Sequence, residues 1–268
     1  MGKETFVNYW IGQEPTPPSP MLEAMPEGVD VVPLAFVTIE EGTYELNFDF
    51  LCTTHSPEVI RQGIQAVQGR GAKVLFSIND EKIGRVPDVG AFVENVVQNV
   101  VAWGVDGVDI DFEPPYVSKT LLEVTAALRP ALRRALNGTE PLLTAPIYGP
   151  WLGIPDFLRE FAQLLDFVTT MDYALVEEST KLCWQYMKVI GRPEKVAIGT
   201  ICMTEPPPSP GDFNSLEEVV AMCRWEPTRG RKLGAMLYTF SYDVTARRGG
   251  GTRQPNGAYT KAIIANLP

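Results

Sequence analysis

Eight short apolar segments, separated by stretches with helical periodicity, constrain the fold of this 268-residue chain more than any other feature. Most of them are continuous apolar runs, as expected of parallel strands that are buried on both faces. The predicted strands are Phe6–Trp10, Val31–Thr38, Lys73–Ile78, Gly107–Glu113, Leu142–Ile147, Phe167–Tyr173, Val196–Cys202 and Ala235–Phe240.

The segments between these strands have the apolar spacing of amphipathic helices. Ser56 and Gly71 provide a start and a stop for the first helix, and Pro130 should kink a later one. The predicted helices are Pro57–Arg70, Asp88–Trp103, Ser118–Leu136, Asp156–Leu165, Thr180–Ile190, Leu216–Arg224 and Ala258–Ala265.

Eight β-α units in about 250 residues are the size of an α/β TIM barrel, (β/α)8. The alternatives are a doubly wound open sheet and a two-domain chain, but no linker-like change of composition supports two domains. We therefore expect a single domain over residues 1–268, with the Pro-rich stretches Pro15–Pro20 and Pro206–Pro210 in rim loops. Active sites of such barrels lie at the C-terminal ends of the strands.

Residues 106–113 read Asp-Gly-Val-Asp-Ile-Asp-Phe-Glu. The alternation places Asp109, Asp111 and Glu113 on one face of a strand, with roughly 6.5–7 Å between neighbouring acids. Mutual repulsion should raise at least one pKa, and a carboxylic acid that stays protonated near neutral pH can act as a general acid. A fold rarely keeps such a row of inward charges for stability alone.

Two other interpretations fit the same pattern. A D-x-D-x-E row could bind a divalent cation through oxygen ligands. It could also be a solvated strand at the edge of a sheet, although the apolar residues before it and Pro114-Pro115 after it argue against an edge. The spacing alone leaves acid catalysis and a cation site open.

The charge and the apolar content of the chain limit the kinds of partner that it is expected to bind. The net charge of -10 disfavours nucleic acid and anionic membranes, and no run of 18 apolar residues predicts a membrane span. The first residues lack the apolar core of a signal peptide, so we expect an intracellular protein or a mature domain, with the compartment open. Cys52, Cys183, Cys202 and Cys223 form no C-x-x-C pair, which argues against a zinc site and favours thiols, with a disulfide still open.

With a barrel assigned, the octapeptide resembles the D-G-x-D-x-D-x-E signature of family 18 glycoside hydrolases, the chitinases and endo-β-N-acetylglucosaminidases. Asp106, Gly107, Asp109, Asp111 and Glu113 match every fixed position. Weaker similarities fall in register on other strands, at Tyr9, Ala35-Phe36, Lys73–Ile78, Met171–Tyr173 and Gly234–Tyr238.

The resemblance implies retaining, substrate-assisted hydrolysis of β-1,4 bonds next to N-acetylglucosamine, with no cofactor and no metal. Glu113 would be the acid and then the base. Asp111 would orient the acetamide, Asp109 would share a proton or hydrogen bond with Asp111, and Tyr173 would hold the acetamide oxygen. Asp106, out of phase with the other acids, is expected to be structural. The residues expected to bind substrate are Tyr9, Phe36, Ser77, Tyr148, Trp151, Met171 and Tyr238.

The sequence also departs from the family pattern. Asn79-Asp80 stand where the strand-three motif continues Gly-Gly, which should place larger side chains on the rim. Ala174 replaces an Asp or Asn beside the acid, and Tyr238 replaces the tryptophan that supports the sugar. The interval between strands seven and eight is too short for an α+β insertion, so we expect a compact barrel with an open cleft.

These features leave several functions to compare. The first is a chitinase-like enzyme, acting as a monomer on an oligo- or polysaccharide that contains N-acetylglucosamine. The alternatives are an endo-β-N-acetylglucosaminidase acting on N-glycan cores and a non-catalytic carbohydrate-binding barrel. A metal-dependent phosphodiesterase would lack the expected histidines, since His55 is the only histidine.

Overall fold

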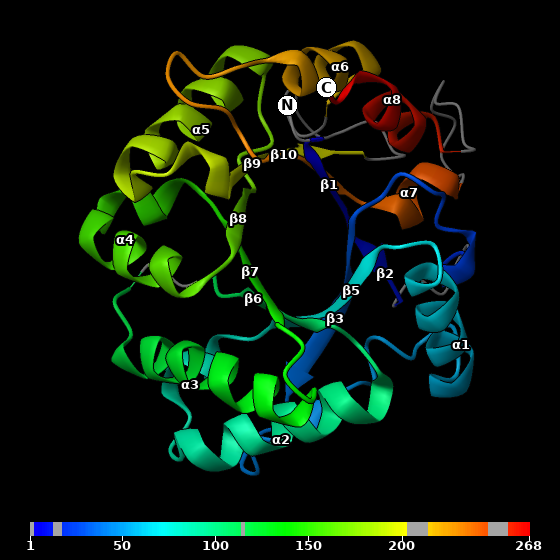
Figure 1. Ribbon diagram of the computed structural model, residues 1–268, viewed down its shortest axis with the longest axis vertical. Helices are drawn as coiled ribbons and strands as arrows, with labels where there is room; N and C mark the ends of the chain where they lie inside the picture. The colour runs from blue at the N-terminus through cyan, green and yellow to red at the C-terminus, as the bar shows by residue number, and fades with distance from the viewer. Residues whose placement is uncertain (1–2, 13–17, 114–115, 203–213, 246–256) are drawn as a thin grey trace.

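A computed structural model describes residues 3–12, 18–113, 116–202, 214–245 and 257–268. Its parallel strands form a closed barrel with the helices outside, a single TIM barrel as predicted (Figure 1). Pairing runs in the order β1-β10-β9-β8-β7-β6-β5-β3-β2, and β1 also pairs with β3, which closes the ring. The strands are β1 (Thr5–Asn8), β2 (Trp10–Ile11), β3 (Val31–Ile39), β5 (Lys73–Asn79), β6 (Gly107–Asp111), β7 (Leu142–Ile147), β8 (Phe167–Thr170), β9 (Val196–Ile201) and β10 (Gly234–Tyr238), with the short β4 (Leu46–Asn47) antiparallel to β3.

Helices follow the barrel strands from β3 onward. The helices are α1 (Pro57–Gln68), α2 (Val89–Trp103), α3 (Lys119–Ala135), α4 (Pro155–Leu164), α5 (Val176–Ile190), α6 (Leu216–Arg224), α7 (Phe240–Val244) and α8 (Ala258–Asn266). The first connection contains only a 3-10 turn, Leu22–Ala24, within its described residues 18–30. None of the described helices has the length and apolar character to cross a membrane.

The predicted elements are largely confirmed, but several strand ends were placed too far along the chain. β6 ends at Asp111, β8 ends at Thr170 and β10 ends at Tyr238, because beyond these points the chain leaves the ladder for the rim. Helix α7, whose first turn is capped by the hydroxyl of Thr239, was not predicted. Helix α3 continues through Pro130.

Three further predictions concern the cysteines, Asp106 and the Pro-rich stretches. The four cysteines, all in the described part of the chain, are thiols and not disulfides. Asp106 is structural: it accepts hydrogen bonds from Lys73 Nζ at 2.7 Å and from the amide of Val74 at 2.9 Å, which ties the start of β6 to β5. Residues 15–17 and Pro206–Pro210 lie outside the described residues.

Alternating side chains of the strands build two cores. Val108 and Ile110 of β6 face outward into the large core beneath the helices. A smaller cluster inside the barrel includes Val7, Leu75 and Met236. Because this inner cluster packs the barrel interior with apolar side chains, the inward acids of β6 are shielded from water.

The glycine of the acidic motif has a packing role that can be tested. A Cβ at Gly107 would lie 2.0 Å from the backbone oxygen of Leu142 on β7, so the two strands could not keep their spacing. We expect Gly107→Ala to lower the free energy of unfolding by at least about 2 kcal/mol in urea denaturation. Gly153→Ala is the matched control, because nothing lies within 4 Å of its Cβ. Equal stabilities of the two variants would contradict this explanation.

Candidate active site

The inward positions of β5 and β6 pair polar side chains across the ladder. Ser77 is in register with Asp109, and two residues further along Asn79 is in register with Asp111. Ser77 Oγ donates to Asp109 Oδ2 at 2.8 Å, and Asn79 Nδ2 donates to Asp111 Oδ2 at 2.6 Å. The period of two that aligns the acids on one strand therefore also aligns a donor for each acid on the next.

Asp109 is buried and is surrounded by hydroxyl groups. Tyr9 donates to Oδ2 at 2.8 Å and Thr144 donates to Oδ1 at 2.6 Å, in addition to Ser77. Burial raises the pKa of Asp109, and these three hydrogen bonds oppose the rise. Among the described residues, its hydrogen bonds go to these hydroxyls and none to Asp111, in contrast to the expected hydrogen bond between the two acids.

Asp111 is also buried, with only 4% of its surface exposed, but its two oxygens differ. Oδ2 accepts from Asn79, whereas Oδ1 has no hydrogen-bond partner among the described residues. Burial raises the pKa of Asp111 well above its ordinary 3.8; the Asn79 hydrogen bond opposes this, and the charges of Asp109 and Glu113 add to it. The predicted rise is therefore confirmed, but repulsion is its smaller cause.

Glu113 lies past the end of β6, on the rim, and its side chain is exposed. The prediction that the strand extends to Glu113 is therefore wrong. Its Oε1 accepts from Asn79 Nδ2 at 3.2 Å, and its backbone oxygen accepts a hydrogen bond from the hydroxyl of Tyr148. Asn79 thus donates to both Asp111 and Glu113.

A cavity of about 310 Å³ opens at this end of the barrel, which is enough for a small polar ligand. Most of the predicted site residues line it. The lining residues are Tyr9, Phe36, Asn79, Asp111, Glu113, Pro146, Tyr148, Met171, Tyr173, Met236 and Tyr238.

Aromatic rings form one wall of the cavity around Tyr238. The ring of Tyr238 stacks on Phe36 and on Tyr173, with centroid distances of 6.4 and 6.3 Å, and Tyr9 lies 5.8 Å away. Such a wall offers apolar ring faces edged with hydroxyl groups, which suits a sugar ring. Burial raises the pKa of Tyr173 well above 10, so its hydroxyl stays protonated and can donate a hydrogen bond.

Two predicted substrate-binding residues lie elsewhere. Trp151 is fully buried and stacks on Phe157 and Phe161 of α4, at 5.7 and 5.4 Å, because the 3-10 turn Gly149–Gly153 directs it back toward that helix. Ser77 is buried against Asp109 and does not line the cavity.

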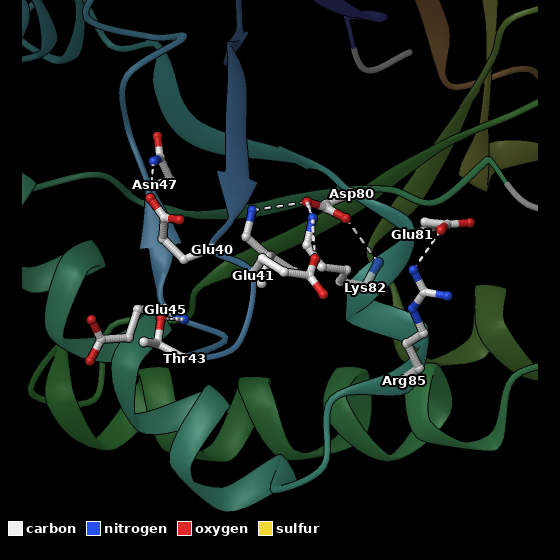
Figure 2. A network of polar contacts seen from close by, with 10 residues as sticks. Glu40, Glu41, Thr43, Glu45, Asn47, Asp80, Glu81, Lys82 and Arg85 are labelled. Atoms are coloured by element: carbon white, nitrogen blue, oxygen red, sulfur yellow. Dashed lines mark hydrogen bonds and ion pairs between the residues drawn. The ribbon is translucent and has the colours of Figure 1, made fainter.

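Asp80, expected on the rim beside Asn79, does not line the cavity; its side chain contacts Lys82 instead (Figure 2). Its Oδ2 accepts from the amide of Ile39 at 3.0 Å and from Lys82 Nζ at 2.7 Å, and its Oδ1 accepts from the amide of Lys82. Asp80 therefore caps a 3-10 turn and anchors β3. Of the two residues that depart from the expected Gly-Gly, Asn79 lines the cavity and Asp80 does not.

The sequence assigned no role in the site to four of its residues: Asn79, which was expected only as a larger side chain on the rim, Thr144, Pro146 and Met236. The alternation of Ser77 and Asn79 along β5 could have revealed the first, because it repeats the alternation of the acids on β6. Within the described residues, no group of three or more His, Cys, Asp or Glu side chains converges as a metal site would require.

The chain resembles several known proteins. Residues 8–237 match the family described as the endo-β-N-acetylglucosaminidase EndoS TIM-barrel domain. No curated protein matches the sequence. Among solved structures, a GH18 chitinase from Pseudoalteromonas aurantia has a TM-score of 0.73 at 19% identity, covering 98% of this chain and 100% of that one. An endo-β-N-acetylglucosaminidase from Cordyceps militaris has a TM-score of 0.70 at 18% identity, covering 99% and 91%.

A mutant catalytic domain of the Ostrinia furnacalis Group II chitinase, solved with an N-acetylated chito-oligosaccharide, has a TM-score of 0.70 at 13% identity, covering 99% of this chain and 97% of that one. At these identities the structural neighbours establish the fold. The family match covers most of the chain, and with the neighbours it supports a glycoside hydrolase function. The described residues form a compact barrel with the fold of these GH18 structures, and the protein belongs to the family of the EndoS TIM-barrel domain.

Proposed function

We propose that residues 1–268 form one catalytic barrel that hydrolyses the β-1,4 bond on the reducing side of an N-acetylglucosamine, with retention of configuration and with the substrate's own acetamide as nucleophile. The observation that carries this proposal is the buried Oδ1 of Asp111, which has no hydrogen-bond partner in the described part of the chain, beside the exposed carboxyl group of Glu113 in one sugar-sized cavity. No cofactor is required.

In the first step, Glu113 transfers its carboxyl proton to the glycosidic oxygen, and the bond from that oxygen to the anomeric carbon breaks. The acetamide carbonyl oxygen forms a new bond to the anomeric carbon, giving a cyclic oxazolinium ion, and the leaving sugar departs as an alcohol. Asp111 Oδ1 would accept the acetamide N–H and balance the positive charge, while the Tyr173 hydroxyl would hold the acetamide oxygen in line.

In the second step, the Glu113 carboxylate removes a proton from water as that water attacks the anomeric carbon. The bond to the acetamide oxygen breaks, and the product keeps the β configuration. Asp109, which accepts hydrogen bonds from Tyr9, Ser77 and Thr144, acts by holding Tyr9 in place at the edge of the cavity.

The substrate could be chitin or the core of an N-glycan, since both contain an N-acetylglucosamine linked β-1,4 to a second one. The match to the EndoS domain supports the N-glycan core, and the chitinase neighbours support chitin. A panel of chito-oligosaccharides and N-glycopeptides, with the products identified by mass, distinguishes the two. Binding without turnover of every member would instead indicate a carbohydrate-binding barrel.

Glu113→Gln tests the proton donor. We expect kcat to fall about 10²- to 10⁴-fold, because the amide cannot deliver a proton to the leaving group. Thermal unfolding and binding of a chito-oligosaccharide should stay unchanged, since the side chain is exposed. Turnover close to that of the unmodified protein would refute the assignment.

The role of the acetamide can be tested with the substrate. A chito-oligosaccharide whose N-acetyl groups have been removed carries no internal nucleophile, so we expect no measurable cleavage, while the acetylated compound yields β-anomeric product by NMR. Comparable cleavage of both compounds, or an α-anomeric product, would contradict substrate assistance.

The buried charge of Asp111 should cost stability. Its pKa is higher in the folded chain than the 3.8 of an exposed carboxyl group, so the folded state binds more protons and stability falls as pH rises above about 3.8, until the folded pKa is passed. Asp111→Asn should therefore stabilise the protein at pH 8 and have little effect near pH 4, with about 1.4 kcal/mol for each unit of difference in pKa.

Asp156→Asn, a surface control whose side chain is 94% exposed, should change stability by less than about 1 kcal/mol. A stability gain for Asp111→Asn that does not depend on pH would contradict this explanation.

A further inference from the structure

We propose that Asn79 is a positioning residue of the reaction: its side-chain amide holds Asp111 and Glu113 in one fixed arrangement, with Asp111 Oδ1 and Glu113 Oε2 left for the substrate. This inference rests on the proposed function and adds to it a residue outside the acidic motif.

The geometry of the amide supports this role. Nδ2 has two protons, and its two acceptors are Asp111 Oδ2 at 2.6 Å and Glu113 Oε1 at 3.2 Å. Both protons of the amide nitrogen are therefore used between the two carboxyl groups. If the amide were turned over, its oxygen would face both carboxyl groups. An ionised carboxyl group has no proton to donate to that oxygen, so the orientation with Nδ2 toward the acids is favoured.

The amide distinguishes the two oxygens of each acid. An oxygen that accepts an N–H is favoured as the carbonyl oxygen of a protonated carboxyl group, so the transferable proton of Glu113 belongs on Oε2. At Asp111, donation to Oδ2 favours the ionised form and leaves Oδ1 as the acceptor for the acetamide N–H. Asn79 itself lines the cavity, beside the two acids that it contacts.

The position of Asn79 on the fold explains how one side chain can reach both acids. It is the last residue of β5 and is paired in register with Asp111, the last residue of β6. Glu113 lies just past that point on the rim. A glycine at position 79 would remove the donor altogether, and Asp111 and Glu113 would depend on the substrate to fix their orientations.

The test compares Asn79→Ala and Asn79→Asp with the unmodified protein, using the chito-oligosaccharide or glycopeptide that is cleaved. For Asn79→Ala we expect kcat to fall about 10- to 100-fold, with KM changed by less than about threefold. The acid limb of the kcat/KM profile should move to higher pH, because Asp111 loses a donor to its ionised form. For Asn79→Asp, which keeps the shape, activity should be lower still at neutral pH and should recover as the pH falls and the new carboxyl group gains a proton to donate.

Two controls separate the possible outcomes. Asn99→Ala, on the outer helix α2, should leave kcat and the pH profile unchanged, because the Asn99 side chain donates its hydrogen bonds to Asn95 and lies outside the cavity lining. If Glu113→Gln is inactive while both Asn79 variants keep the kcat and the acid limb of the unmodified protein, the role of Asn79 is refuted and the proposed function stands. Turnover by Glu113→Gln would instead refute the proposed function. If Asn79→Ala does not fold, the pH profile of the isosteric Asn79→Asp decides.

Discussion

The burial of two neighbouring carboxyl groups on β6 is the constraint on which the rest of the site depends. Asp109 and Asp111 are 1% and 4% exposed, and no lysine or arginine is hydrogen-bonded to either within the described residues. Burying such groups without a cation is costly, and the cost is reduced only by neutral donors. In the portion of the chain that the structure describes, three hydroxyl groups supply them for Asp109, whereas Asp111 has one donor and one oxygen without a hydrogen-bond partner. This difference separates a carboxyl group that is structurally satisfied from one that can receive a ligand.

The barrel makes this arrangement possible through strand register. Because β5 and β6 are parallel and paired residue by residue, Ser77 and Asn79 fall opposite Asp109 and Asp111. On the opposite face of β6, Val108 and Ile110 pack under the helices, so the strand cannot slip by one residue without burying its acids in the apolar core. Gly107 allows the close approach of β7, and Asp106 ties the beginning of the strand to β5. The residues of the acidic motif therefore divide between those that hold the strand and those that face the cavity.

Much of this could be predicted from the sequence. The apolar runs predicted the eight barrel strands, and the alternation in residues 106–113 predicted which acids face inward. The strand ends were harder to predict, since Phe112 and Glu113 continue the alternating pattern after the ladder has ended. Trp151 was misplaced because an aromatic residue just past a strand looks the same in sequence whether it faces a sugar or a helix; the 3-10 turn decides this, and nothing in Tyr-Gly-Pro-Trp encodes its direction. The role of Asn79 depends on a pairing between two strands, which the resemblance to the family obscured by marking the position as a departure.

Burial should make Asp111 hold its proton more tightly than an ordinary aspartate, because the barrel shields this carboxyl group from water. Carbon-13 NMR of the side-chain carboxyl groups, followed as a function of pH in protein labelled at aspartate, measures this pKa directly. We expect one carboxyl resonance, absent from the Asp111→Asn variant, that titrates well above the ordinary value of 3.8. If the resonance lost in that variant titrates near 3.8, Asp111 is not shielded from water, and burial does not govern the chemistry of this site.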